Sequence, residues 1–71
     1  MAKAYRFDDR KPIMGTIVSA FRTLKALKDF VRMQGGKMGT MKFWEISGTI
    51  VTDEGGPDGI QIRVSSARQV S

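Results

Sequence analysis

The chain has neither cysteine nor histidine among its 71 residues, and this double absence limits how so short a chain can hold a fold. A domain of this length buries only about 60% of the surface that its unfolded form exposes. Short chains often gain stability from disulfides, bound metals or association with other chains. Here no disulfide can form, and the usual zinc, haem and iron–sulfur ligand sets are missing. We expect one domain over residues 1–71, stabilised by its apolar core, with a homo-oligomer or a larger complex as further support.

The composition also argues against an enzyme. Histidine is the commonest general base near neutral pH, and the cysteine thiolate is a common nucleophile. Residues 5–12 resemble the YRxDxRxP segment at the start of cholera- and pertussis-type ADP-ribosyltransferases, which implies an NAD contact for Arg6. That family's later Ser-Thr-Ser strand and catalytic glutamate motif are absent from this chain. We therefore expect no catalytic residues, no cofactor and no metal.

Charge is distributed unevenly along the sequence. Residues 10–42 contain eight basic side chains and one acidic one, whereas residues 43–62 contain four acids and no base. The net charge of the chain is +5. Such asymmetry favours an acidic partner, either a nucleic acid or an acidic protein surface.

The clearest secondary-structure signal is an amphipathic helix after residue 19. Ser19 is a suitable N-cap, because its hydroxyl can accept a hydrogen bond from the first helical turn. Gly35 and Gly36 favour an end to the helix, since glycine adopts the left-handed C′ conformation easily. Apolar residues follow at spacings of four, three and four, which is one face of a helix: Ala20, Leu24, Leu27 and Val31.

Alternating apolar residues predict strands over residues 3–8, 41–52 and 60–65. Gly48 inside the second of these predicts a bulge. Residues 13–18 are ambiguous between strand and helix, and we favour a strand because Thr16, Ile17 and Val18 are β-branched. Residues 67–71 are expected to fray.

These elements predict an α+β fold, a small antiparallel sheet in β-(β)-α-β-β order with one amphipathic helix packed on one face. The predicted core comprises Tyr5, Phe7, Ile17, Ala20, Leu24, Leu27, Val31, Trp44, Ile46, Ile50, Ile60, Ile62 and Val64.

The polar side of the predicted helix carries a row of cations within an arc of about 120°. A glycine-rich segment after the helix adds further lysines. We expect a non-enzymatic module that holds nucleic-acid phosphates with little sequence preference, although an ordinary solvated helix face would show the same pattern. The candidate nucleic-acid-binding residues are Arg22, Lys25, Lys28, Arg32, Lys37 and Lys42.

The alternative is a small inhibitor or adaptor, of a kind common in phages and mobile elements, that docks on a larger and possibly nucleic-acid-handling complex. Flexible methionines beside an aromatic suit an adaptable protein interface, and the candidates are Met38, Met41 and Phe43. The sequence has no signal-like N-terminus and no run of about 18 apolar residues. We expect a cytoplasmic protein without a membrane partner.

Overall fold

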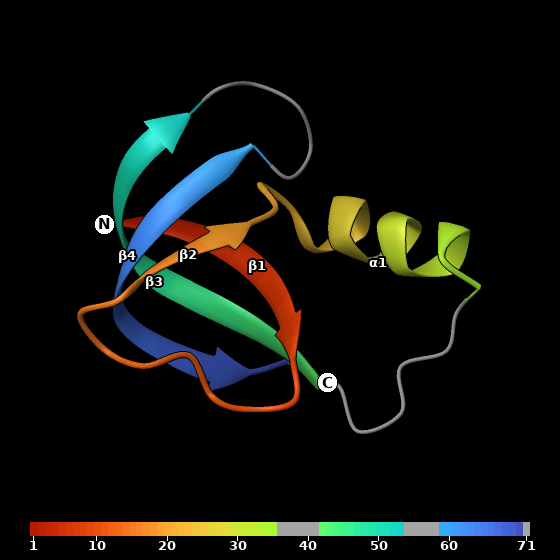
Figure 1. The fold of residues 1–71 in the computed structure, drawn as a ribbon, viewed down its shortest axis with the longest axis horizontal. Helices are drawn as coiled ribbons and strands as arrows, with labels where there is room; N and C mark the ends of the chain where they lie inside the picture. Colours follow the sequence, from red (N-terminus) through yellow and green to blue (C-terminus); the bar gives the residue numbers. More distant parts are fainter. Residues whose placement is uncertain (36–41, 54–58, 71) are drawn as a thin grey trace.

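Four strands from distant parts of the chain form one curled antiparallel sheet, and one helix lies beside it (Figure 1). The computed structural model describes residues 1–35, 42–53 and 59–70, and every count here refers to those ranges. The protein is therefore a small α+β fold, as predicted. In chain order the elements are β1 (Ala2–Asp8), β2 (Ile17–Ala20), α1 (Leu24–Met33), β3 (Lys42–Asp53) and β4 (Ile60–Gln69).

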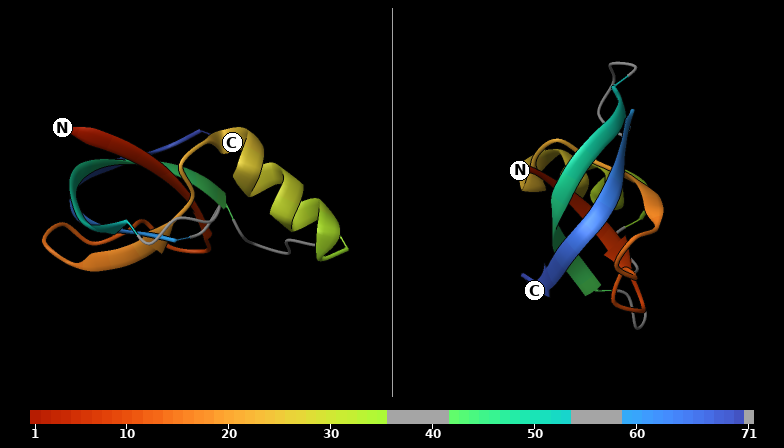
Figure 2. Two further views of the ribbon diagram at one scale, coloured as in Figure 1. Left: turned by 90° about the horizontal axis from the view of Figure 1, so that it is seen from above. Right: turned by 90° about the vertical axis from the view of Figure 1, so that its left-hand side faces the viewer.

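The sheet has the order β1-β3-β4-β2, with every neighbouring pair antiparallel. Its two edge strands approach each other because the sheet curls, as Figure 2 shows. At that point the Tyr5 N–H donates to the Phe21 carbonyl at 2.8 Å, and the Phe21 N–H donates to the Tyr5 carbonyl at 2.7 Å. This single bridge partly closes the sheet into a barrel-like form.

The curl is accompanied by two irregularities between β3 and β4. The register shifts between Ser47 and Gly48 and again between Ile50 and Thr52. The bulge predicted at Gly48 is confirmed. A β-bulge bends its strand and increases the local twist, which a four-stranded sheet needs in order to curl back on itself.

The interior of the curl forms one apolar cluster without any contribution from the helix. It comprises Ala4, Ala20, Ile46, Ile60, Ile62 and Val64. We expected one core between the helix and the sheet, and this expectation is wrong because the helix does not contribute to this cluster. The sheet buries part of its apolar surface against itself, because its concave face is closed by its own edge strands.

Two residues predicted in the core lie largely outside it. Ile17 is 46% exposed and Ile50 is 37% exposed. Ile17 stands opposite Arg63, which is exposed, and residues directly opposite each other in an antiparallel pair share a face. The side chain of Ile17 therefore belongs to the outer surface of the sheet.

The helix begins four residues later than its periodicity suggested. Thr23 is the N-cap, and its hydroxyl accepts a hydrogen bond from the Ala26 N–H at 3.0 Å. Ser19 lies in β2 opposite Gln61, so the predicted Ser19 cap is wrong. Pairing with β4 brings Ile17–Ala20 into the sheet, whereas residues 13–16 form a turn. The predicted strand over residues 13–18 is therefore confirmed only for Ile17 and Val18.

A second apolar cluster lies between α1 and the outer face of β1 and β3. Leu27 and Val31 from the helix pack there with Phe21 and Phe43. Tyr5 and Phe7 of β1 pack against the same cluster. The start of β3 is therefore covered on both faces, and four consecutive residues are buried: Phe43, Trp44, Glu45 and Ile46.

Strand β4 is longer than its alternation indicated. It continues to Gln69 because its second half pairs with β3 between Trp44 and Ser47. The Val70 N–H also donates to the Phe43 carbonyl at 2.9 Å. The expected fraying is therefore wrong for residues 67–70, and residue 71 lies outside the described ranges.

We predict that Gly48→Ala destabilises the fold by about 2–3 kcal/mol, because a Cβ at this position would collide with the Arg63 carbonyl oxygen of β4. Both atoms are held by the sheet, so the strands would have to separate. Thr49→Ala, an exposed neighbour on the same strand, should cost less than about 1 kcal/mol. Urea unfolding of both variants measures the difference, and equal losses would contradict the close approach.

Candidate functional site

Three of the predicted cations lie together on α1. Lys25, Lys28 and Arg32 fall within an arc of about 60° at 100° per residue. The side chains of Lys25 and Arg32 are 86% and 82% exposed. The apolar stripe of the helix faces β1 and β3, which leaves this basic helix face (Lys25, Lys28 and Arg32) open to solvent.

One carboxylate lies within the basic helix face. Asp29 Oδ2 is 3.0 Å from Lys25 Nζ, and Asp29 Oδ1 is 3.9 Å from Arg32 Nη1. Exposed ion pairs of this kind contribute about 0–1 kcal/mol, so an incoming anion can replace Asp29 as a partner. Lys28 Nζ lies 6.0 Å from the centroid of the Phe43 ring and forms a cation–π contact.

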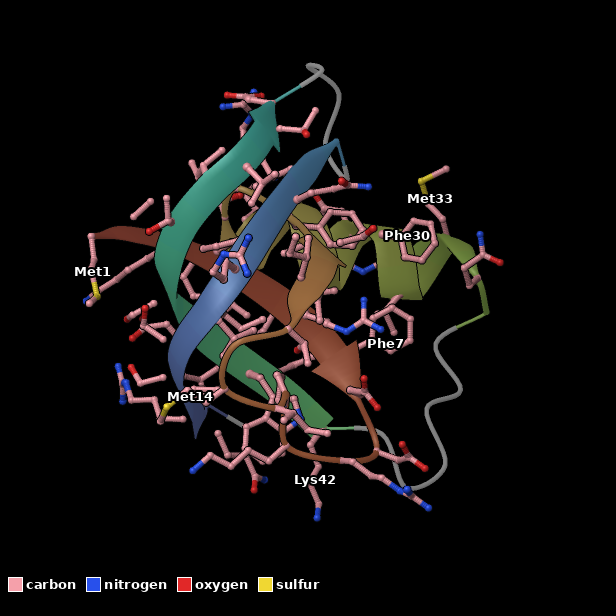
Figure 3. All side chains as sticks on the ribbon, turned by 60° about the vertical axis from the view of Figure 1, so that its left-hand side comes forward. Met1, Phe7, Met14, Phe30, Met33 and Lys42 are labelled. Carbon is pink, nitrogen blue, oxygen red and sulfur yellow. The ribbon has the colours of Figure 1, made fainter. Side chains whose placement is uncertain are left out.

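Two of the other predicted cations, Arg22 and Lys42, do not join this face. Arg22 precedes the helix and forms an ion pair with Asp53 at the end of β3. Lys42 begins β3, and its side chain points away from α1 (Figure 3). Lys37 lies outside the described residues. Of the five predicted cations that lie in the described residues, the structure therefore brings three together.

The structure departs further from the predicted protein interface than from the predicted row of cations. Met38 and Met41 lie outside the described residues. Phe43, expected at the surface, is buried beneath α1 and forms part of the second apolar cluster. Alternation along β3 correctly separated Phe43 from Trp44, but it could not show that the helix covers the second face.

Exposed apolar side chains occur instead in the turn before β2. Ile13 is 71% exposed and Met14 is 74% exposed. The β-branched residues that follow predict a strand here, whereas the structure has a turn. Gly15 is the residue in the sequence that indicates this turn, because an apolar pair followed by glycine also fits a turn in which the glycine has a positive φ.

A polar row crosses the sheet next to the helix. Tyr5, Glu45 and Arg68 stand opposite one another on β1, β3 and β4. The Arg68 Nε–H donates to Glu45 Oε1 at 2.9 Å, and the Tyr5 hydroxyl donates to Glu45 Oε2 at 3.2 Å. Lys3 Nζ lies 3.8 Å from Glu45 Oε1.

These contacts set the acid–base behaviour of the row. The hydrogen bond from Arg68 is the main reason that the pKa of Glu45 lies below its ordinary value, and partial burial opposes it. Burial, together with the adjacent Glu45 carboxylate, raises the pKa of Tyr5 above its ordinary value. Both Glu45 oxygens are already paired, so we interpret the row as a bond between strands and not as a reactive centre.

Within residues 1–35, 42–53 and 59–70, no three acidic side chains gather in a way that could hold a metal ion. In the same ranges no helix has the length and hydropathy to cross a membrane. No family model matches the sequence, and comparison with curated proteins and with solved structures found no match. Only the surfaces of this chain therefore indicate a function.

We predict that Arg68→Gln raises the pKa of Glu45 toward its ordinary value, since it removes the main cause of the lowered pKa. Carbon-13 NMR titration of the Glu45 carboxyl measures this change directly. A carboxyl with a lowered folded-state pKa stabilises the fold above its unfolded-state pKa of about 4.5 and loses that effect as pH falls.

The stability difference between the wild-type chain and Arg68→Gln should therefore be largest near neutral pH and shrink as pH falls below about 4.5. Arg63→Gln on the same strand is the control, since Arg63 does not contact Glu45. A stability difference that stays constant from neutral to acid pH would contradict the proposed role of Arg68.

Proposed function

We propose that this protein is a non-enzymatic module that binds the phosphates of a nucleic acid through the basic helix face. The observation that supports this is the exposure of three cations on one side of α1 against a single acid, Asp29. The net charge of +5 adds a favourable long-range field for a polyanion.

The spacing of the cations suits a phosphate backbone. From Lys25 to Arg32 the helix advances about 10 Å, at about 1.5 Å per residue. One strand of duplex DNA presents a charge about every 3.4 Å along the axis, so the three side chains can reach about three successive phosphates. Three such contacts correspond to a log–log salt slope of about −2.7.

The same face lacks the side chains that read adenine. The sequence of α1 contains no asparagine or glutamine, the side chains that pair with adenine in the major groove. Contacts to phosphate fix position without carrying sequence information. The proposed binding is therefore independent of sequence.

The second candidate function is a small inhibitor or adaptor that docks on a larger complex. The burial of Phe43 removes the surface on which this idea first depended. The exposed side chains of Ile13 and Met14 favour it on a different surface. The two functions are compatible, because the turn and the basic helix face lie on different parts of the molecule (Figure 3).

We predict that the chain binds a random-sequence DNA duplex with an affinity that falls steeply and linearly in a log–log salt titration. Lys28→Gln should weaken binding to every sequence equally and flatten the slope by about 0.9. Fluorescence anisotropy of a labelled duplex measures both quantities. Lys3→Gln makes the same charge change at the start of β1, away from α1, and is the matched control.

Equal effects of Lys28→Gln and Lys3→Gln would assign the binding to net charge and refute a role for this face. No binding at low salt would refute the proposed function as a whole. Lys42→Gln adds a further comparison, since its side chain points away from the helix and its effect should match that of Lys3→Gln.

We also predict that Asp29→Asn strengthens duplex binding severalfold. The change removes the only acid of the basic helix face and releases Lys25 and Arg32 from their ion pairs. The same anisotropy titration measures the gain. Glu45→Gln, which removes an acid from the polar row of the sheet, is the control, and a gain of the same size there would argue against a local effect.

A further inference from the structure

The segment before β2 forms a defined turn and not a loose loop. The Thr16 N–H donates to the Ile13 carbonyl at 3.2 Å, and the Thr16 hydroxyl donates to the same oxygen at 2.6 Å. Gly15 has φ of 88°, whereas Met14 has no positive φ. This is the pattern of a type II turn, which needs glycine at its third position. Met14 therefore occupies the tip of a conformationally restricted turn.

The turn is also anchored to the sheet. The Gly15 N–H donates to the Val64 carbonyl at 2.8 Å, and the Val64 N–H donates to the Thr16 carbonyl at 2.8 Å. Arg63 Nη1 adds a longer contact of 3.4 Å to the Gly15 carbonyl. A surface held in this way loses little conformational entropy when it binds a partner.

Apolar side chains of this turn are unusually exposed. Ile13, Met14 and Ile17 lie close together in sequence, and all three face solvent. Ile13 and Met14 line an open hollow of about 320 Å³, with Pro12, Val64 and Ala67 among its other walls. Ligand pockets start at about 300 Å³, so the hollow can accept a large side chain of a partner. Exposed apolar groups around a hollow are typical of an interaction site.

We define the turn surface as the hollow together with Lys11, Ile13, Met14, Ile17 and Arg63. Its charges indicate what kind of partner it fits. Lys11 lines the hollow, and Arg63 stands opposite Ile17 on β4. In the described part of the chain neither cation forms an ion pair with a carboxylate. A second copy of this chain would bring like charges together in a symmetric contact, whereas a partner with carboxylates would pair with them.

We propose that the turn surface binds an acidic peptide segment of a partner protein. One apolar side chain of that segment enters the hollow between the turn and β4, and flanking carboxylates pair with Lys11 and Arg63. This inference does not depend on the nucleic-acid proposal. Figure 3 shows Met14 well away from Phe30 and Met33 of α1, so the two surfaces can act separately.

The test uses the whole chain with carbon-13-labelled methionine methyl groups and a set of synthetic peptides. The peptides are rich in Asp and Glu and carry a central Leu, Phe or Trp, and a matched set carries Ser at the centre. We expect the peptides with a central apolar residue to shift the Met14 methyl signal in NMR spectra and to leave the Met33 signal in place. The matched Ser peptides should bind at least tenfold more weakly.

The matched variants are Met14→Ser and Met33→Ser, because both methionines are exposed and neither change should unfold the chain. Met14→Ser should weaken peptide binding at least tenfold, and Met33→Ser should leave it unchanged. Lys11→Glu should weaken the binding of the acidic peptides. It should strengthen the binding of peptides in which Lys replaces the acidic residues. Equal effects of the two methionine variants would overturn the proposal.

Three other outcomes would also overturn it. Failure of every apolar acidic peptide to bind would remove the proposed partner chemistry. Binding of Met14 to mixed phosphatidylcholine–phosphatidylserine vesicles, without peptide binding, would assign the surface to lipid. Concentration-dependent self-association abolished by Met14→Ser would assign it to a second copy. Lys28→Gln should leave peptide binding unchanged, so failure of one proposal is distinguishable from failure of the other.

Discussion

The close approach of β3 to β4 at Gly48 is the constraint on which the rest of the structure depends. No side chain fits between Gly48 and the Arg63 carbonyl, so the two strands meet there backbone to backbone. The register shifts at the same place, and the sheet bends. Because it bends, the edge strands can meet at Tyr5 and Phe21, and the apolar face of the sheet closes on itself. A chain without disulfides gains a buried core in this way.

Because the sheet curls, the helix does not have to cover that core. Helix α1 packs on the outer face, over β1 and the start of β3, and builds a second apolar cluster there. The start of β3 is consequently buried on both faces. This explains why Phe43 and Trp44 can be adjacent in sequence and both be buried. Glu45 is buried on the same side of the sheet. Its two carboxylate oxygens accept hydrogen bonds from Tyr5 and Arg68 on the neighbouring strands.

Two different surfaces result from this arrangement. The helix turns its apolar stripe inward, which leaves Lys25, Lys28 and Arg32 in solvent. The turn ahead of β2 exposes Ile13 and Met14 beside β4. One surface is positively charged, and the other combines exposed apolar side chains with a hollow. Their separation lets a chain of 71 residues carry the proposed polyanion site and the proposed protein-docking site together.

Local patterns in the sequence determined the elements that depend on neighbours along the chain. The spacing of Leu24, Leu27 and Val31 indicated the helix and its solvent-facing cations, and Gly48 indicated the bulge. Only the tertiary structure decided what covers each face, because periodicity shows which side of an element is apolar and not what packs against it. Pairing with β4 placed Ser19 in a strand, α1 buried Phe43, and the turn ahead of β2 left Met14 exposed. These outcomes depend on contacts between residues distant in sequence, which no local pattern records.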